Sequence, residues 1–195
     1  MHLPTHSLLL PRITVPVLLV AMIVAACGGS SERKIDIDAR TGITQQGDAL
    51  SLTVYVVDIE DEVYYRDSNG SIYVKRPSLP GNKIAAVFVQ VRNHGATNVI
   101  IDVGHDSLEL RDDAPNGEYP PIDPFLGLEL APNVPIDREA LDVMWGPYEL
   151  ANTFAVRAWT FFEIPGDVLP TQLRWSNVNT IFVRWLEFER PSPQP

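Results

Sequence analysis

Histidines with acidic neighbours are the first residues that could carry catalytic chemistry. Outside the N-terminal segment the chain has two, His94 and His105, and Asp102 and Asp106 lie near the second. A serine hydrolase would need a serine held beside a histidine, but the chain has no Gly-x-Ser-x-Gly elbow. Zinc needs three or four ligands, and two imidazoles do not supply them. We therefore predict no catalytic residue, no enzyme activity and no cofactor.

Acidic side chains gather directly after an apolar run at residues 50–57. They are Asp58, Glu60, Asp61 and Glu62, and clustered carboxylates on a loop are ligands that calcium favours. A solvated loop that keeps strand edges from aggregating would have the same composition. We predict no resident metal, and these four residues are the candidates for a calcium site.

Aromatic side chains offer contact chemistry rather than catalysis. Trp145 and Tyr148 lie in the proline-rich stretch 118–150, whereas Trp159 and Trp185 lie in strand-like segments and are expected to pack in the core. Tryptophan and tyrosine are enriched at interfaces because they bury a large area and keep a polar group. We predict that Trp145 and Tyr148 contact a partner.

The single cysteine follows a segment with the features of an export signal. Ile13–Ile23 is apolar but too short to span a bilayer, and Val24-Ala25-Ala26-Cys27 comes after it. This motif resembles the bacterial lipobox, in which the cysteine is acylated before cleavage. We predict that 1–26 is a signal peptide and that Cys27 carries the lipid, for example palmitate. Each buried CH₂ would contribute roughly 0.8 kcal/mol to membrane anchoring.

The charge balance restricts the partners of the mature chain. Removal of 1–26 would leave 14 lysines and arginines against 25 aspartates and glutamates. Such a body is repelled by phosphate backbones, so we predict no nucleic-acid partner. Residues 27–48 are predicted to form the lipidated end and a flexible tether, and 191–195 a proline-rich tail.

Short β-branched and aromatic segments separated by turn residues run through 49–190. Lys83–Asn93 has the pattern of a central strand, and 63–66 and 71–76 flank Asp67-Ser68-Asn69-Gly70 as a hairpin would. Inside the insert 118–150, Asp137 could cap a short helix over Arg138–Met144. The pattern predicts an all-β fold, an immunoglobulin-like antiparallel β-sandwich with one short helix. A small β-barrel is the alternative.

Three further segments carry a family resemblance. They are Ala86–Asn98 (AVFVQVRNHGATN), Ser107–Asp113 (SLELRDD) and Trp159–Pro165 (WTFFEIP). In this order they resemble a telokin-like bacterial domain of unknown function, related in fold to a secreted immunoprotective antigen. The resemblance covers roughly Leu50 to Glu189. It implies an immunoglobulin-like sandwich outside the cytoplasm, and it implies no catalytic residue.

These observations together predict a lipid-anchored binding or interaction module without catalytic activity. It would lie on the extracytoplasmic face of the cell membrane or envelope and bind an envelope protein or another extracellular ligand. The alternative is a surface lipoprotein that binds calcium or a small ligand. Loops at the ends of the sandwich and the 118–150 insert would supply the contacts.

Substitution of the cysteine tests the anchor. Cys27→Ala removes the thiol that would accept the lipid, so we expect the variant to move from the detergent phase to the aqueous phase in detergent partitioning. Mass spectrometry of the wild-type N-terminal peptide should show acyl groups on Cys27. Ser30→Ala, three residues away, is the control and should stay in the detergent phase. An unmodified Cys27 would contradict the prediction.

Overall fold

A computed structural model describes residues 33–35, 37, 39–131, 133–135 and 138–185. Over these residues the regular secondary structure consists of strands, with no helix, so the all-β prediction is confirmed. The predicted signal peptide, Cys27 and the tail 191–195 lie outside the described residues.

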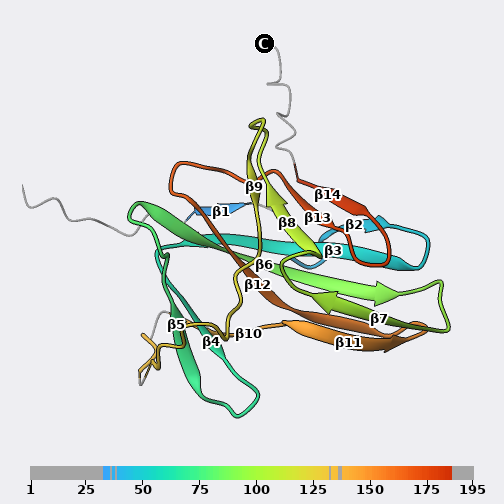
Figure 1. The fold of residues 1–195 in the computed structure, drawn as a ribbon, viewed down its shortest axis with the longest axis horizontal. Coiled ribbons are helices and arrows are strands. Elements are labelled where there is room, and N and C mark those ends of the chain that lie inside the picture. The colour runs from blue at the N-terminus through green and yellow to red at the C-terminus, as the bar shows by residue number, and fades with distance from the viewer. Residues whose placement is uncertain (1–32, 36, 38, 132, 136–137, 186–195) are drawn as a thin grey trace, which may run out of the picture.

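The first layer is a five-stranded antiparallel sheet with β6 at its centre (Figure 1). The order is β1-β3-β6-β12, and β2 pairs with a different part of β3. The strong alternation of 83–93 predicted this central position, which is confirmed. The strands are β1 (Arg33–Ile35), β2 (Ile43–Gln46), β3 (Leu50–Glu60), β6 (Asn82–Asn93) and β12 (Ala155–Pro165).

The second layer consists of a four-stranded sheet, β14-β13-β8-β9, and the antiparallel pair β7 and β11. Its apolar side chains, such as Ile101, Leu110 and Trp175, share one core with Val87 and Val89 of β6. Two layers around one core form a β-sandwich. The strands are β7 (Asn98–Val103), β8 (Leu108–Arg111), β9 (Glu118–Tyr119), β11 (Gly146–Ala151), β13 (Gln172–Trp175) and β14 (Ile181–Arg184).

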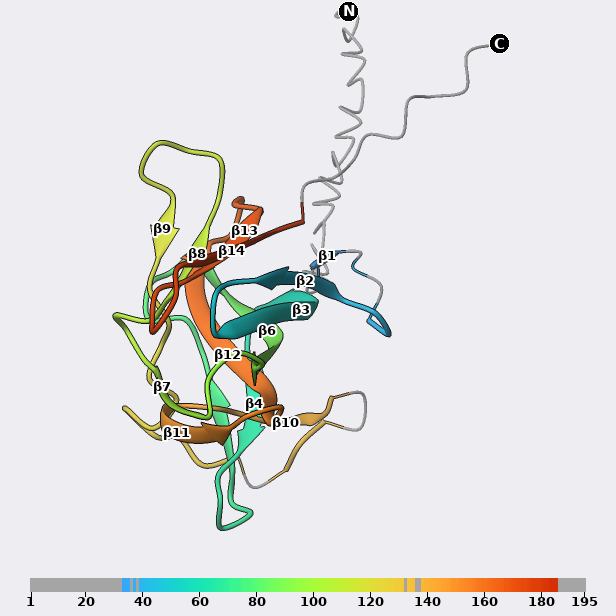
Figure 2. The same cartoon turned by 90° about the vertical axis from the view of Figure 1, so that its right-hand side faces the viewer.

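A hairpin formed by β4 (Val63–Arg66) and β5 (Ile72–Lys75) projects from the sandwich (Figure 2). It was predicted from its turn, and the structure confirms it: Asp67 Oδ1 accepts hydrogen bonds from the backbone N–H groups of Asn69 (2.8 Å) and Ser71 (2.9 Å). Gly70 takes φ +83°, which favours glycine. The base of the hairpin packs on the outer face of the first sheet, and its contacts there are Val63 and Tyr65 against Ile84, Ala86 and Phe161.

The helix predicted over Arg138–Met144 is wrong. Ala140–Asp142 forms strand β10, which runs parallel to β4, and Met144 N donates to Trp159 O at 3.0 Å. The local capping pattern favours a helix, but the edges of β4 and β12 offer unpaired backbone groups to this segment. Hydrogen bonding to these edges outweighs the local preference. Asp137, the predicted cap, lies outside the described residues.

The tether predicted for 27–48 is shorter in the structure. Residues 33–35 and 43–46 of this segment form β1 and β2, and both strands pair with the same edge of β3. The exposed backbone of β3 accounts for this pairing, since a long strand with an open edge recruits neighbouring chain.

Two asparagine side chains join the layers of the sandwich. Asn93, fully buried at the end of β6, donates from Nδ2 to Leu150 O of β11 at 2.9 Å. Asn179, in the β13–β14 turn, accepts at Oδ1 from Ala49 N (2.9 Å) and Leu50 N (3.1 Å). These bonds satisfy backbone groups that would otherwise be buried without partners.

Glu163 of β12 fastens the loop between β5 and β6. Its carboxylate accepts four hydrogen bonds, from Ser78 N (2.9 Å), Ser78 Oγ (2.7 Å), Leu79 N (2.9 Å) and Asn82 Nδ2 (2.9 Å). Burial alone would raise the pKa of Glu163, but these hydrogen bonds to the charged form outweigh it and lower the pKa.

A Glu163→Gln variant should be less stable than the wild type at neutral pH by about 1–2 kcal/mol, because the bonds to the charged carboxylate are lost. The pKa of Glu163 is lower in the folded state than its ordinary value of 4.5. The charged carboxylate therefore stabilises the fold fully at pH values above 4.5, and this stabilisation is lost as the pH falls through the lowered pKa. The difference in Tm between the two proteins should therefore shrink in acid. Glu139→Gln, an exposed change of equal charge, is the control. A difference that is constant with pH would contradict the assignment.

Candidate functional site

The two aromatic residues predicted to contact a partner line one cavity of about 260 Å³. Three separate segments build its wall: the tip of the β4–β5 hairpin, the loop after β9, and the β10–β11 connection. The hairpin and the loop bring residues that the sequence did not single out, because no local pattern marks them. The lining is Arg66, Asp67, Ser68, Phe125, Asp142, Val143, Trp145 and Tyr148.

Trp145 and Tyr148 are half-buried and hold each other in place. Trp145 N donates to the Tyr148 hydroxyl at 3.2 Å. Gly146 between them takes φ +85°, a conformation that favours glycine. The ring of His105 meets that of Trp145 edge to face, with 5.2 Å between centroids. The indole is therefore supported on one side and faces the cavity with a fixed orientation.

Tyr65 fixes the loop that carries Phe125. Its hydroxyl donates to Pro124 O, and burial raises the pKa of Tyr65 to about 12, so the phenol stays neutral. Phe125 itself remains 43% exposed. A buried hydrogen bond beside an exposed ring gives the cavity a positioned apolar wall.

The charged part of the cavity is open to solvent. Arg66 Nη1 lies 3.6 Å from Asp142 Oδ1, and both side chains are largely exposed. Such a surface ion pair contributes little to stability, about 0–1 kcal/mol. Either group can therefore turn to a charged partner at low cost.

The four calcium candidates do not converge on one point. Glu60 pairs with Arg138, Asp61 lies 3.0 Å from Lys83, and Glu62 accepts from Tyr64 OH at 2.6 Å. Glu60 and Asp58 line a second cavity, of about 250 Å³, on the outer face of the first sheet.

Successive residues of a strand point to opposite faces, and Glu60, at the end of β3, meets a different cation from Asp61. Within the described ranges, no three His, Cys, Asp or Glu side chains are placed to hold a metal ion.

His94 and His105 occupy separate turns. His94 N donates to Ala49 O at 2.9 Å, while the His105 ring packs on Trp145. The second histidine thus has a packing role at the candidate site.

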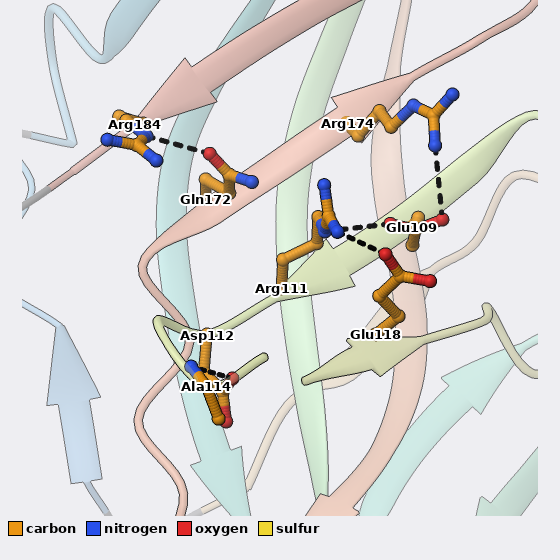
Figure 3. A network of polar contacts seen from close by, with 8 residues as sticks. All are labelled: Glu109, Arg111, Asp112, Ala114, Glu118, Gln172, Arg174 and Arg184. Atoms are coloured by element: carbon orange, nitrogen blue, oxygen red, sulfur yellow. Dashed lines mark hydrogen bonds and ion pairs between the residues drawn. The ribbon is translucent and has the colours of Figure 1, made fainter. Parts of the chain in front are cut away.

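The solvent face of the β14-β13-β8-β9 sheet carries a network of paired charges (Figure 3). Arg111 contacts Glu118 and lies 2.9 Å from Glu109, and Arg174 lies 3.5 Å from Glu109. Arg184 Nε donates to Gln172 Oε1 at 2.8 Å. Apart from Glu109 and Arg111, which both lie on β8, the paired residues are cross-strand neighbours, so the network stabilises the sheet and leaves little free charge there.

The chain was compared with family models, curated proteins and solved structures. No family model matches the chain, and no curated protein matches it. The crystal structure of ycdA from Bacillus subtilis, described as a putative lipoprotein, aligns at 12% identity with a TM-score of 0.47. The match covers 74% of this chain and 38% of that protein. The resemblance to the telokin-like domain stays a prediction. The structure also shows no helix, over the residues it describes, that is long and apolar enough to cross a bilayer.

Calcium should leave the Tm of the full chain unchanged, because Glu60, Asp61 and Glu62 are each engaged by a different side chain. A ligand that binds only the folded state raises Tm, so a thermal melt with and without millimolar calcium measures this directly. Magnesium at equal concentration controls for ionic strength. A rise in Tm with calcium alone would contradict the prediction.

Proposed function

We propose that this chain is a lipid-anchored, extracytoplasmic interaction module that binds a protein of the cell envelope through the cavity around Trp145 and Tyr148. One observation carries the proposal: residues from three distant segments place Phe125, Trp145 and Tyr148 around one opening, beside the Arg66–Asp142 pair. Interfaces have this composition, with aromatic anchors at the centre and exchangeable charges at the rim.

The size of the cavity favours a protein partner over a small ligand. Sites for small molecules are typically about 300–1,000 Å³ and bury most of the ligand. At about 260 Å³ and open to solvent, this cavity fits one anchoring side chain of a partner. An aromatic or aliphatic side chain with a neighbouring charge would match the rings and the Arg66–Asp142 pair.

The anchor in this proposal is the lipid on Cys27. The short apolar segment before it, the two small residues Ala25 and Ala26, and the absence of any other cysteine support lipidation. The proposed module catalyses no reaction. The separate positions of His94 and His105 support that part of the proposal.

A photo-crosslinking amino acid at position 145 tests the binding site in intact cells. We expect a specific adduct with an envelope protein, because the indole faces the cavity. The same amino acid at Phe182 is the matched control, since Phe182 is 46% exposed but lies on β14, which contributes no residue to the cavity. Identical adducts from both positions would contradict the proposal.

Truncation of the Trp145 side chain should weaken binding of the captured protein. Trp145→Ala is expected to raise the Kd for the captured protein by about 30-fold, the size of a 2 kcal/mol hot spot. Phe182→Ala should leave the Kd within about twofold, as expected for a residue outside the interface. An unchanged Kd in Trp145→Ala would place the interface elsewhere.

A further inference from the structure

The outer face of the first sheet is covered over one half only. The base of the β4–β5 hairpin lies on Ile84, Ala86 and Phe161. Beyond them no strand of the described chain lies over the sheet. We call this uncovered part the open face. It consists of Thr44, Gln46, Phe88, Gln90, Arg92, Ala155 and Arg157, which surround the buried side chains of Ser51, Thr53 and Tyr55.

Strand register places these side chains in cross-strand rows. Thr44, Thr53, Gln90 and Arg157 form one row, because each is the partner of the next across β2, β3, β6 and β12. Directly opposed residues point to the same side of a sheet and lie close together. The neighbouring rows are Gln46–Ser51–Arg92–Ala155 and Phe88–Trp159.

The guanidinium of Arg157 lies over two aromatic rings. Its Cζ lies 3.9 Å from the ring centroid of Tyr55 and 4.6 Å from that of Phe88. Phe88 in turn stacks on Trp159, with centroids 5.0 Å apart and an interplanar angle of 26°. Stacking fixes the plane of a guanidinium and leaves its N–H edge free to donate.

The open face carries positive charge on an acidic protein. Its ionisable cations are Arg92 and Arg157, both exposed, and the nearest carboxylates on the sheet, Asp58 and Glu60, line the cavity under the hairpin, where Glu60 pairs with Arg138. The whole chain has a formal net charge of −10. Over the described residues, no carboxylate pairs with Arg157, whereas Arg111 and Arg174 on the other layer are each paired.

We propose that the open face is a second binding site, and that it takes an anionic polysaccharide. An oriented guanidinium donates two parallel hydrogen bonds to a carboxylate or phosphate group. The hydroxyl and amide groups of Thr44, Gln46 and Gln90 match sugar hydroxyls.

Other anionic surfaces fit this face less well. Recognition of anionic lipid typically uses clusters of about 4–8 lysines or arginines, and the open face has Arg92 and Arg157 alone. Nucleic acid would meet a body of net charge −10 around a small cationic area.

Affinity electrophoresis of the full chain in detergent, with polygalacturonate in the gel, tests the proposal. We expect the wild type to be retarded and Arg157→Ala to bind at least about tenfold more weakly. Arg157→Lys keeps the charge but loses the planar fork, so its affinity should be intermediate. Arg184→Ala is the control of equal charge, because Arg184 pairs with Gln172 on the other layer.

Two additional probes separate sugar recognition from charge and from membrane binding. Poly-L-glutamate supplies carboxylates without sugar rings, and vesicles that contain phosphatidylglycerol supply an anionic membrane. Both should bind more weakly than polygalacturonate.

Any of three results would overturn the proposal: no retardation of the wild type, equal or stronger binding of either additional probe, or an equal loss in Arg157→Ala and Arg184→Ala. A thermal melt checks that each variant is folded. If Arg157→Ala does not fold, Arg92→Ala takes its place with the same expected direction.

Discussion

The pairing of β6 on both edges is the constraint on which the rest of the structure depends. β3 and β12 bond to it along nearly its whole length, and its inward side chains, Ala85, Val87, Val89 and Val91, are buried in the shared core. The opposite side of β6 changes character along the strand. Ile84 and Ala86 are buried under the hairpin, while Gln90 and Arg92 face outward beyond it. One strand thus sets both the core and the division of the outer face into a covered and an open half.

The 118–150 insert covers the open edge of the first sheet. β12 is the last strand of the first sheet, and its outer edge would expose backbone groups to other chains. The insert covers this edge: Ile122 N donates to Phe161 O at 2.7 Å, and Met144 N donates to Trp159 O. The same path then carries Trp145 to the hairpin tip. The segment that protects the sheet edge is therefore also the segment that builds the candidate site.

The sequence predicted those parts of the fold whose signals are local. Alternation marked the strand at 83–93, and Asp67–Gly70 marked the hairpin, because both patterns are complete within a few residues. The segment 138–144 was misassigned because its conformation depends on pairing with other strands, β4 and β12, rather than on its own residues. Trp145 and Tyr148 could be singled out as aromatics in a proline-rich stretch. Arg66 and Phe125 could not, since only the folded chain brings them to the same cavity. The register of β6 and β12, which aligns Gln90 with Arg157, is likewise a property of the folded sheet.

The pairing of β1 with β3 also sets how far the body can stand from a bilayer. Five residues lie between Cys27 and Arg33, where the sheet begins, and the six steps from one Cα to the next span at most about 20–22 Å. A protein attached through Cys27 would therefore stay close to the lipid surface rather than sweep a wide volume. Its binding partners would have to come to the membrane, or be embedded in it, to be within reach.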